Sequence, residues 1–179
     1  SLYIADVFAG TGCIGIAILK NIRSAKVDFA DVSKKATEQI ELNLKLNKIE
    51  RKRYKIYQSN LFEKLKNRKY DYIFANPPYV AKERLGEVQE AVKKLEPKIA
   101  WYGGKRGMRY IKKFLKTAKN FLEKDGIIFM ELDPLQKDEI GKIIKKQNYG
   151  KLEFLKDQFK KWRFIKIWNL KKSFKKDIR

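Results

Sequence analysis

Histidine is absent from this 179-residue sequence, and Cys13 is its only cysteine. A catalytic triad built on histidine and a zinc site built on histidine and cysteine are therefore excluded. A single cysteine also excludes a disulfide within the chain, which favours a reducing compartment and predicts a cytoplasmic protein. No apolar run approaches the roughly 18 residues of a membrane span, so we expect no membrane association.

Acidic residues are scarce: 21 stand against 43 basic ones, and the net charge is +22. A charge of this size favours a polyanionic partner, and we expect weak association with RNA or the ribosome through a basic surface. Most of the basic residues are lysines spread along the whole chain, whereas arginine is the preferred reader of phosphates and base edges. A lysine-rich background composition therefore explains the charge equally well.

The length suits one domain with a full core. The chain begins at Ser1 rather than a methionine, and Leu2 to Ala5 already have the composition of a strand. We therefore expect a segment upstream that this sequence does not include. Residues 1–170 are predicted to form the domain, residues 171–179 a charged tail, and the protein a monomer.

Strands and helices alternate along the chain, as the spacing of apolar residues indicates. This alternation predicts an α/β fold with a mostly parallel sheet and helices on both faces. The last two strands should pair antiparallel, because no segment of crossover length separates them. Strands are predicted at 2–8, 26–31, 54–59, 70–75, 127–132, 151–155 and 162–170, helices at 13–21, 33–47, 108–123 and 134–147, a turn at 124–126, and a partly helical stretch at 80–95.

A glycine-rich loop follows the first strand. Gly10, Gly12 and Gly15 spell G-x-G-x-x-G between a strand and a helix, a pattern typical of nucleotide-binding loops. Asp31 ends the second strand, where an acid can accept both hydroxyls of an adenosine ribose, as in NAD or S-adenosylmethionine. It is less suited to capping the next helix than Ser33.

The fourth strand leads into Asn76-Pro77-Pro78-Tyr79. Each proline fixes φ and removes an N–H donor, and the residue before a proline is held extended. The turn therefore presents an amide side chain at Asn76, a free carbonyl at Pro77 and a ring at Tyr79. This set suits a planar NH2 group, of a carboxamide or of a nucleic-acid base. A rigid turn without chemistry is the alternative.

Parallel sheets bind ligands beyond the C-terminal ends of their strands. The Gly10–Gly12 loop, Asp31, Asn60 and Asn76 follow four successive strands, so we expect them to meet at one edge. Asn60 either reads an adenine edge there or is an ordinary turn asparagine. The glycine-rich stretch at 96–107 is too long for a simple connector, which predicts a functional loop, or else a mobile surface excursion.

Together these motifs resemble the class I, S-adenosylmethionine-dependent methyltransferases, and within them the HemK/PrmC family, which methylates the glutamine of the Gly-Gly-Gln loop in peptide-chain release factors. The resemblance implies a Rossmann-like fold with a seven-stranded, mostly parallel sheet and a C-terminal antiparallel hairpin. It rests on Asp6 with the glycine loop, Asp31-Val32-Ser33, Asn76-Pro77-Pro78-Tyr79, the spacing Glu96-Pro97, Ala100, Gly103-Gly104 and Gly107, and the pairs Glu131 with Gln136 and Asp157 with Arg163. The Asn-Pro-Pro-Tyr turn is shared with amine methyltransferases of DNA and RNA, whereas the Glu-Pro to Gly-Gly stretch is more specific to the glutamine enzymes.

The resemblance implies S-adenosylmethionine as cofactor, a release factor as partner and no metal. It implies that Asn76, Pro77 and Tyr79 are catalytic: the Asn76 side-chain oxygen and the Pro77 carbonyl accept the two N–H bonds of the glutamine amide, and the Tyr79 ring packs against it. The implied cofactor-binding residues are Asp6, Phe8, Ala9, Gly10, Thr11, Gly12, Asp31, Val32, Asn60, Leu61 and Asn76. The implied substrate-binding residues are Asn76, Pro77, Pro78, Tyr79, Glu96, Gly103 and Gly104.

Three features depart from the family's pattern. Phe8 stands where the family usually has glycine, Asn60 stands where it commonly has aspartate, and the family's N-terminal helical domain is absent from this chain. Phe8 and the basic charge keep open an amine methyltransferase acting on ribosomal RNA or DNA. The glycine spacing also permits an NAD-dependent dehydrogenase, although that leaves the Asn76–Tyr79 turn unexplained. A methyltransferase-like binding module without catalysis is the last alternative.

Overall fold

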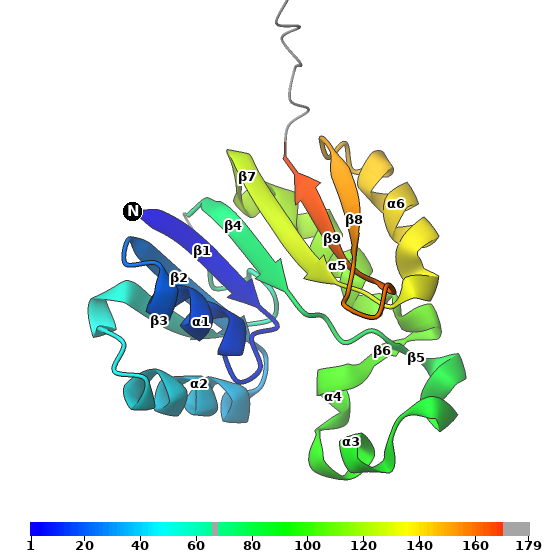
Figure 1. Cartoon of the computed structure of the whole chain (residues 1–179), viewed down its shortest axis with the longest axis horizontal. Helices are drawn as coiled ribbons and strands as arrows, with labels where there is room; N and C mark the ends of the chain where they lie inside the picture. The colour runs from blue at the N-terminus through cyan, green and yellow to red at the C-terminus, as the bar shows by residue number, and fades with distance from the viewer. Residues whose placement is uncertain (66–67, 170–179) are drawn as a thin grey trace, which may run out of the picture.

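The structure is a computed structural model that describes residues 1–65 and 68–169. Seven strands form one sheet in the order β3-β2-β1-β4-β7-β9-β8 (Figure 1). The pairs from β3 to β7 are parallel, and β9 pairs antiparallel with both β7 and β8. The predicted α/β class, with a mostly parallel sheet and a closing antiparallel hairpin, is therefore confirmed. The strands are β1 (Leu2–Val7), β2 (Ala25–Asp31), β3 (Tyr54–Gln58), β4 (Tyr70–Ala75), β7 (Leu122–Glu131), β8 (Leu152–Lys156) and β9 (Trp162–Trp168).

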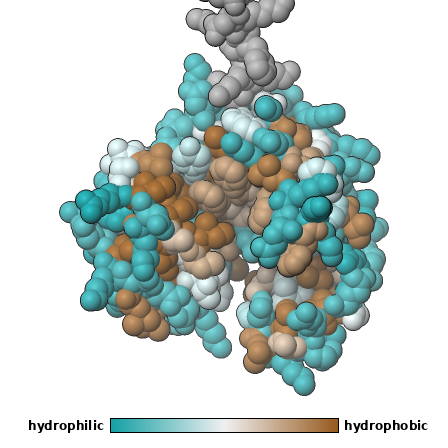
Figure 2. Space-filling view, in the orientation of Figure 1, coloured by the Kyte–Doolittle hydropathy of each residue, from teal (hydrophilic) through white to brown (hydrophobic). Residues whose placement is uncertain are grey.

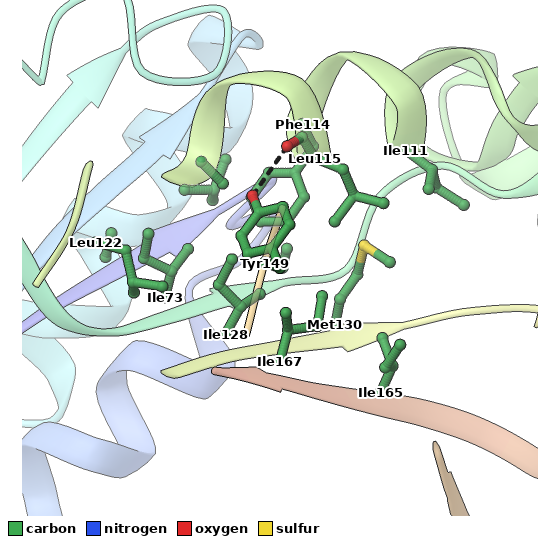
Figure 3. Close-up of a cluster of buried hydrophobic side chains, with 14 of the residues drawn as sticks. Ile73, Ile111, Phe114, Leu115, Leu122, Ile128, Met130, Tyr149, Ile165 and Ile167 are labelled. Carbon is green, nitrogen blue, oxygen red and sulfur yellow. Dashed lines mark hydrogen bonds between the residues drawn. The ribbon is translucent and has the colours of Figure 1, made fainter. Parts of the chain in front are cut away.

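Helices cover both faces of the sheet, as expected. On one face α1 (Cys13–Asn21) and α2 (Lys34–Leu46) pack on β1 to β3, and on the other α5 (Arg109–Ala118) and α6 (Lys137–Lys146) pack on β4, β7 and β9. The larger cluster lies under α5 and α6, where the Tyr149 hydroxyl donates to the Leu115 carbonyl at 2.9 Å (Figure 3). This bond satisfies the one polar atom of a ring otherwise buried among aliphatic side chains.

Local sequence signals explain how the second strand leads into its helix. Ser33 is the N-cap of α2, and its hydroxyl oxygen accepts from the Ala36 amide at 3.3 Å, as the sequence predicted. Gly15 lies inside α1, where a Cβ would stand 2.2 Å from the Phe29 ring of β2. The third glycine of the G-x-G-x-x-G pattern therefore serves close packing of α1 on the sheet.

One predicted boundary is wrong. The helix expected at 108–123 ends at Ala118; a 3-10 turn η4 (Lys119–Phe121) follows, and β7 already begins at Leu122, so the turn expected at 124–126 lies within a strand. Leu122 is buried and pairs with Tyr70, after which the register shifts. The apolar period of the helix continues through Leu122, so periodicity alone could not separate the two elements.

Smaller differences concern strand and helix ends. Phe8 lies beyond β1, and the helix predicted at 134–147 begins as a 3-10 turn, η5 (Pro134–Gln136), before α6. A further 3-10 turn, η1 (Arg51–Arg53), precedes β3. The predicted tail at 171–179 lies outside the described residues, and within those residues no helix is long and apolar enough to cross a membrane.

The stretch between β4 and α5 forms a unit of its own, which we name the 80–107 segment. Its β5 and β6 pair with each other in parallel, and its helical part agrees with the partly helical stretch expected at 80–95. The loop expected at 96–107 contains a short helix and a short strand. The elements are β5 (Val80–Ala81), η2 (Lys82–Glu87), α3 (Glu90–Leu95), α4 (Lys98–Trp101), β6 (Tyr102–Gly104) and η3 (Lys105–Gly107).

Candidate functional site

The carboxyl ends of β1, β2, β3 and β4 meet at one edge of the sheet (Figure 1). The glycine loop follows β1, Asp31 ends β2, Asn60 follows β3 and Asn76 directly follows β4. Figure 2 shows that the surface is hollowed at this edge, between the α1–α2 side and the 80–107 segment. The structure thus brings the predicted motifs to a common, accessible edge.

The glycine loop is open on the side of Gly10. Gly10 and Gly12 have left-handed φ values of 55° and 78°, which favour glycine. A Cβ on Gly12 would lie 3.1 Å from Ile40, whereas one on Gly10 would meet nothing within 4 Å. The loop is closed from behind by α2, where the Asn43 amide donates to the Thr11 carbonyl, and its front is free to receive a ligand.

Two carboxylates hold the loop in place. Asp6 is 2% exposed and accepts from the Gly15 amide at 2.9 Å, and its burial raises its pKa to about 7. Asp31 accepts from the amides of Gly10 and Ser33, each at 2.9 Å. A carboxylate has about four acceptor positions, so Asp31 keeps capacity for ribose hydroxyls. Contact of either residue with a cofactor stays a prediction.

Phe8 occupies a position that favours glycine, because its φ is 60°. A left-handed conformation costs an L-residue about 1–2 kcal/mol. The half-buried ring packs against the core, with its centroid 6.3 Å from that of Tyr110 and 6.1 Å from that of Phe114, and these contacts offset the cost. The ring thus faces the core, and contact of Phe8 with a cofactor stays a prediction.

The remaining predicted cofactor residues border the same edge. Val32 and Asn60 are exposed, whereas Ala9 is buried and Leu61 is half-buried against the core. The Asn60 amide donates to the Glu63 carboxylate at 2.7 Å, so its side chain already has one partner. The open glycine loop and free Asp31 positions fit S-adenosylmethionine. That Gly10, Thr11, Asp31 and Val32 bind it stays a prediction.

In the Asn76–Tyr79 turn, one exposed amide side chain is supported by two buried prolines. Pro77 and Pro78 are buried, while Asn76 is exposed and its side chain makes no hydrogen bond to the described residues. The Tyr79 hydroxyl donates to the Glu131 carboxylate at 2.9 Å, and burial together with that carboxylate raises the pKa of Tyr79 to about 12. Tyr79 is thus a neutral, anchored ring at physiological pH.

The turn is held from behind by the glycine-rich part of the 80–107 segment. A Cβ on Gly103 would lie 2.5 Å from the Pro78 carbonyl oxygen, and one on Gly107 would lie 1.9 Å from the Tyr79 carbonyl oxygen. Only glycine permits this approach of two backbones. Gly103 and Gly104 are buried, and their contact with a substrate stays a prediction. In the structure Gly103 packs closely against the turn, whereas the space at Gly104 is bounded by Arg109.

A groove of about 1190 Å³ runs beside the turn, between the 80–107 segment and the start of α6. Asn76, Pro77, Pro78, Tyr79 and Glu96 line it, which brings most of the predicted substrate residues together. Its other charged lining residues are Glu83, Arg84, Glu87, Lys105, Arg106, Asp133, Asp138, Glu139 and Lys142. Six carboxylates against four basic groups make this groove slightly acidic in a strongly basic chain.

Several residues around the turn were not predicted as site residues. Arg84 donates to Asp133 at 2.8 Å and so ties the 80–107 segment to η5. Gln136 donates to the Tyr79 carbonyl at 2.9 Å, and Asp133 and Gln136 form a capping box. The spacing Asp-Pro-x-Gln is a recognisable capping signal. Its contact with a turn 57 positions away in the sequence is not readable from spacing.

Comparison with known proteins identifies the family. The family model of the methyltransferase small domain matches residues 1–98. A release factor glutamine methyltransferase from Borreliella burgdorferi is 38% identical over 90% of this chain and 55% of its own length, and one from Fusobacterium nucleatum is 34% identical over 86% and 43%. These similarities confirm the resemblance inferred from the motifs. The chain spans about half the length of the curated relatives it matches.

Solved structures share the fold. A methyltransferase from Pyrococcus furiosus superposes with a TM-score of 0.70 over 94% of this chain and 75% of its own, at 18% identity. A ribosomal protein L11 methylase from Lactobacillus delbrueckii gives 0.67 over 95% and 70%, at 20% identity. These distant structures establish the class I fold alone. The chain therefore belongs to the methyltransferase small domain family, and this family and fold imply S-adenosylmethionine as the methyl donor.

Proposed function

We propose that this chain methylates a glutamine side-chain amide, in the Gly-Gly-Gln motif of a peptide-chain release factor. The observation that supports this most is the Asn76–Tyr79 turn, which carries an exposed amide on a base of two buried prolines beside a groove. Relatives at 30–38% identity over most of this chain carry the name release factor glutamine methyltransferase.

In this proposal the chain acts by positioning its acceptor. S-adenosylmethionine, when bound, supplies an electrophilic methyl group. An amide nitrogen is a poor nucleophile because its lone pair is delocalised, so it depends on placement more than on a base. The Asn76 side-chain oxygen and the Pro77 carbonyl accept its two N–H bonds, and the Tyr79 ring packs against the amide plane. Such placement contributes on the order of 7–11 kcal/mol at best.

No histidine is needed for this reaction, since the nitrogen can release its proton to water after the methyl group arrives. Tyr79 is not a candidate base, because its pKa is raised to about 12 and its hydroxyl already donates to Glu131. In this proposal the bond to Glu131 fixes the Tyr79 ring beside the glutamine amide.

The charge of the groove favours a polypeptide over a nucleic-acid acceptor. Nucleic-acid sites neutralise phosphates with clustered Lys and Arg. Here carboxylates outnumber basic groups around the turn, although the chain as a whole carries +22. The groove therefore lacks the excess of basic groups that a phosphate backbone requires and that an uncharged glutamine loop does not.

We further propose that residues 1–170 are the catalytic domain of a monomeric, cytoplasmic enzyme. Its basic surface outside the groove would add weak, salt-sensitive association with RNA or the ribosome. This association would concentrate the enzyme near its acceptor without taking part in the transfer.

The test is a competition in which labelled S-adenosylmethionine is offered release factor and ribosomal RNA in one tube. Mass spectrometry then locates the methyl group. Asn120→Ala, at an exposed position of η4 before the start of β7, is the control for Asn76→Ala. We expect methylation of the Gly-Gly-Gln glutamine, lost in Asn76→Ala alone. Transfer to RNA, or to neither acceptor, would refute the proposal.

A further inference from the structure

Gln136 is a buried polar side chain whose amide oxygen and nitrogen both have hydrogen-bond partners. It is 4% exposed and lies at the junction of η5 and α6. Its side-chain oxygen accepts from the Asp133 amide at 3.1 Å. Its nitrogen donates to the carbonyls of Tyr79 at 2.9 Å and Arg106 at 3.2 Å. One amide therefore joins three segments that are distant in sequence.

The two ends of this amide serve different purposes. The oxygen completes the capping box of η5, a local contact three residues away. The nitrogen donates to the end of the Asn76–Tyr79 turn and to the glycine-rich η3. Both partners are distant in sequence, so these bonds do not serve the cap. Capping alone would be served by any side chain with an acceptor, so the two N–H donors are the part that requires glutamine.

The side-chain nitrogen of Gln136 is closely packed against Gly107 and the Tyr79 carbonyl. A Cβ on Gly107 would lie 2.3 Å from it and 1.9 Å from the Tyr79 carbonyl oxygen. The Tyr79 side chain is fixed independently, through its hydroxyl bond to Glu131. Tyr79 is thus held at both its backbone and its ring, and the stiff prolyl pair passes that restraint to Asn76.

We propose that Gln136 is a positioning residue for methyl transfer: its two N–H groups set the orientation of the Asn76–Tyr79 turn against the η3 loop. This inference rests on the proposed function, because the turn is taken as the acceptor site. Gln136 contacts neither reacting atom. It acts through the Tyr79 carbonyl, and a displacement of about 1 Å in a reacting geometry lowers a rate by about 100-fold.

Two substitutions separate positioning from capping. Gln136→Glu keeps the capping oxygen but places a carboxylate against two carbonyls, and Gln136→Met keeps the length and removes every polar atom. Gln147→Met, at the opposite end of α6, is the matched control. Turnover is measured with release factor at a temperature where all variants are folded, together with cofactor affinity by calorimetry.

We expect both Gln136 variants to lose about 10- to 100-fold in kcat with cofactor affinity unchanged, and Gln147→Met to resemble the parent. The kcat of Gln136→Glu relative to the parent should rise as pH falls, because a neutral carboxyl group can again donate one hydrogen bond. If the role of Gln136 were purely structural, both Gln136 variants would have lower thermal stability, and the kcat of the folded enzyme would be unchanged. An unchanged kcat for Gln136→Glu would overturn the inference.

Hydrogen exchange by mass spectrometry gives a readout that needs no acceptor. In Gln136→Met, amides at 79–81 and 104–108 should exchange faster while those of α6 stay protected. Equal exchange in the parent and the variant would overturn the inference. If the parent methylates no glutamine, the proposed function fails, and hydrogen exchange still decides whether Gln136 holds the turn.

Discussion

Replacing Gly107 with alanine tests the contact between the η3 loop and the Asn76–Tyr79 turn. The new Cβ would stand 1.9 Å from the Tyr79 carbonyl oxygen, against an ordinary contact of at least 3.4 Å, so the two backbones must separate by about 1.5 Å. Gly107 also has a left-handed φ of 68°, which disfavours alanine independently.

The expected cost follows from these two effects. The left-handed conformation contributes about 1–2 kcal/mol and the crowding about 1–3 kcal/mol. Their sum, roughly 2–5 kcal/mol, is within the usual stability of about 5–15 kcal/mol for a domain, so the variant should still fold. A shift of more than about 1 Å at the turn should lower kcat by about 100-fold.

Urea denaturation gives the free energy of unfolding, and methyl transfer to release factor gives kcat. Gly141→Ala is the control, since its Cβ would meet nothing within 4 Å and its helical position should gain up to about 1 kcal/mol. Gly86→Ala, also in open space, controls for a change within the 80–107 segment. A Gly107→Ala variant as stable and active as these controls would show that the contact does not hold the turn.

Three other changes have defined outcomes. Asn76→Ala should abolish turnover and leave cofactor affinity nearly intact by calorimetry; surviving turnover would show that its amide does not orient the acceptor. Asp6→Asn should flatten the pH dependence of the free energy of unfolding. The pKa of Asp6 is raised from 3.8 to about 7 in the folded protein. Its contribution to the free energy of unfolding is therefore complete below pH 3.8 and is lost as pH rises through 7, roughly 4 kcal/mol in total. An unchanged slope of the unfolding free energy between those pH values would contradict it. Tyr79→Phe removes the donor to Glu131 and should cost about 1–3 kcal/mol in urea denaturation with a lower kcat, whereas equal stability would mean that the bond contributes nothing.

The parts of the fold that repeat a local rule could be predicted. Apolar residues recurring with a period of 2 or of 3.6 predicted the strands of the sheet and the helices that cover it, and Ser33 predicted the start of α2. Boundaries failed where the rule gave no break, as at Leu122, whose side chain continues the apolar face of α5 yet pairs with Tyr70. The spacing of apolar residues along the sequence does not show which residue each of them contacts in the fold.

The site divides in the same way. The order of motifs along the chain determined that Gly10, Asp31, Asn60 and Asn76 would share one edge, because parallel strands all end on the same side of a sheet. The sequence also contained the stiffness of the prolyl turn, which is a property of the proline ring itself.

Only the tertiary structure decided what surrounds that turn. It packs the Phe8 ring against the core, bonds the Tyr79 hydroxyl to Glu131 and places the Gln136 amide against the Tyr79 carbonyl. It also gathered carboxylates into a groove of a chain whose net charge is +22. These facts depend on contacts between residues 50 or more positions apart, and composition and spacing carry no distance information on that scale.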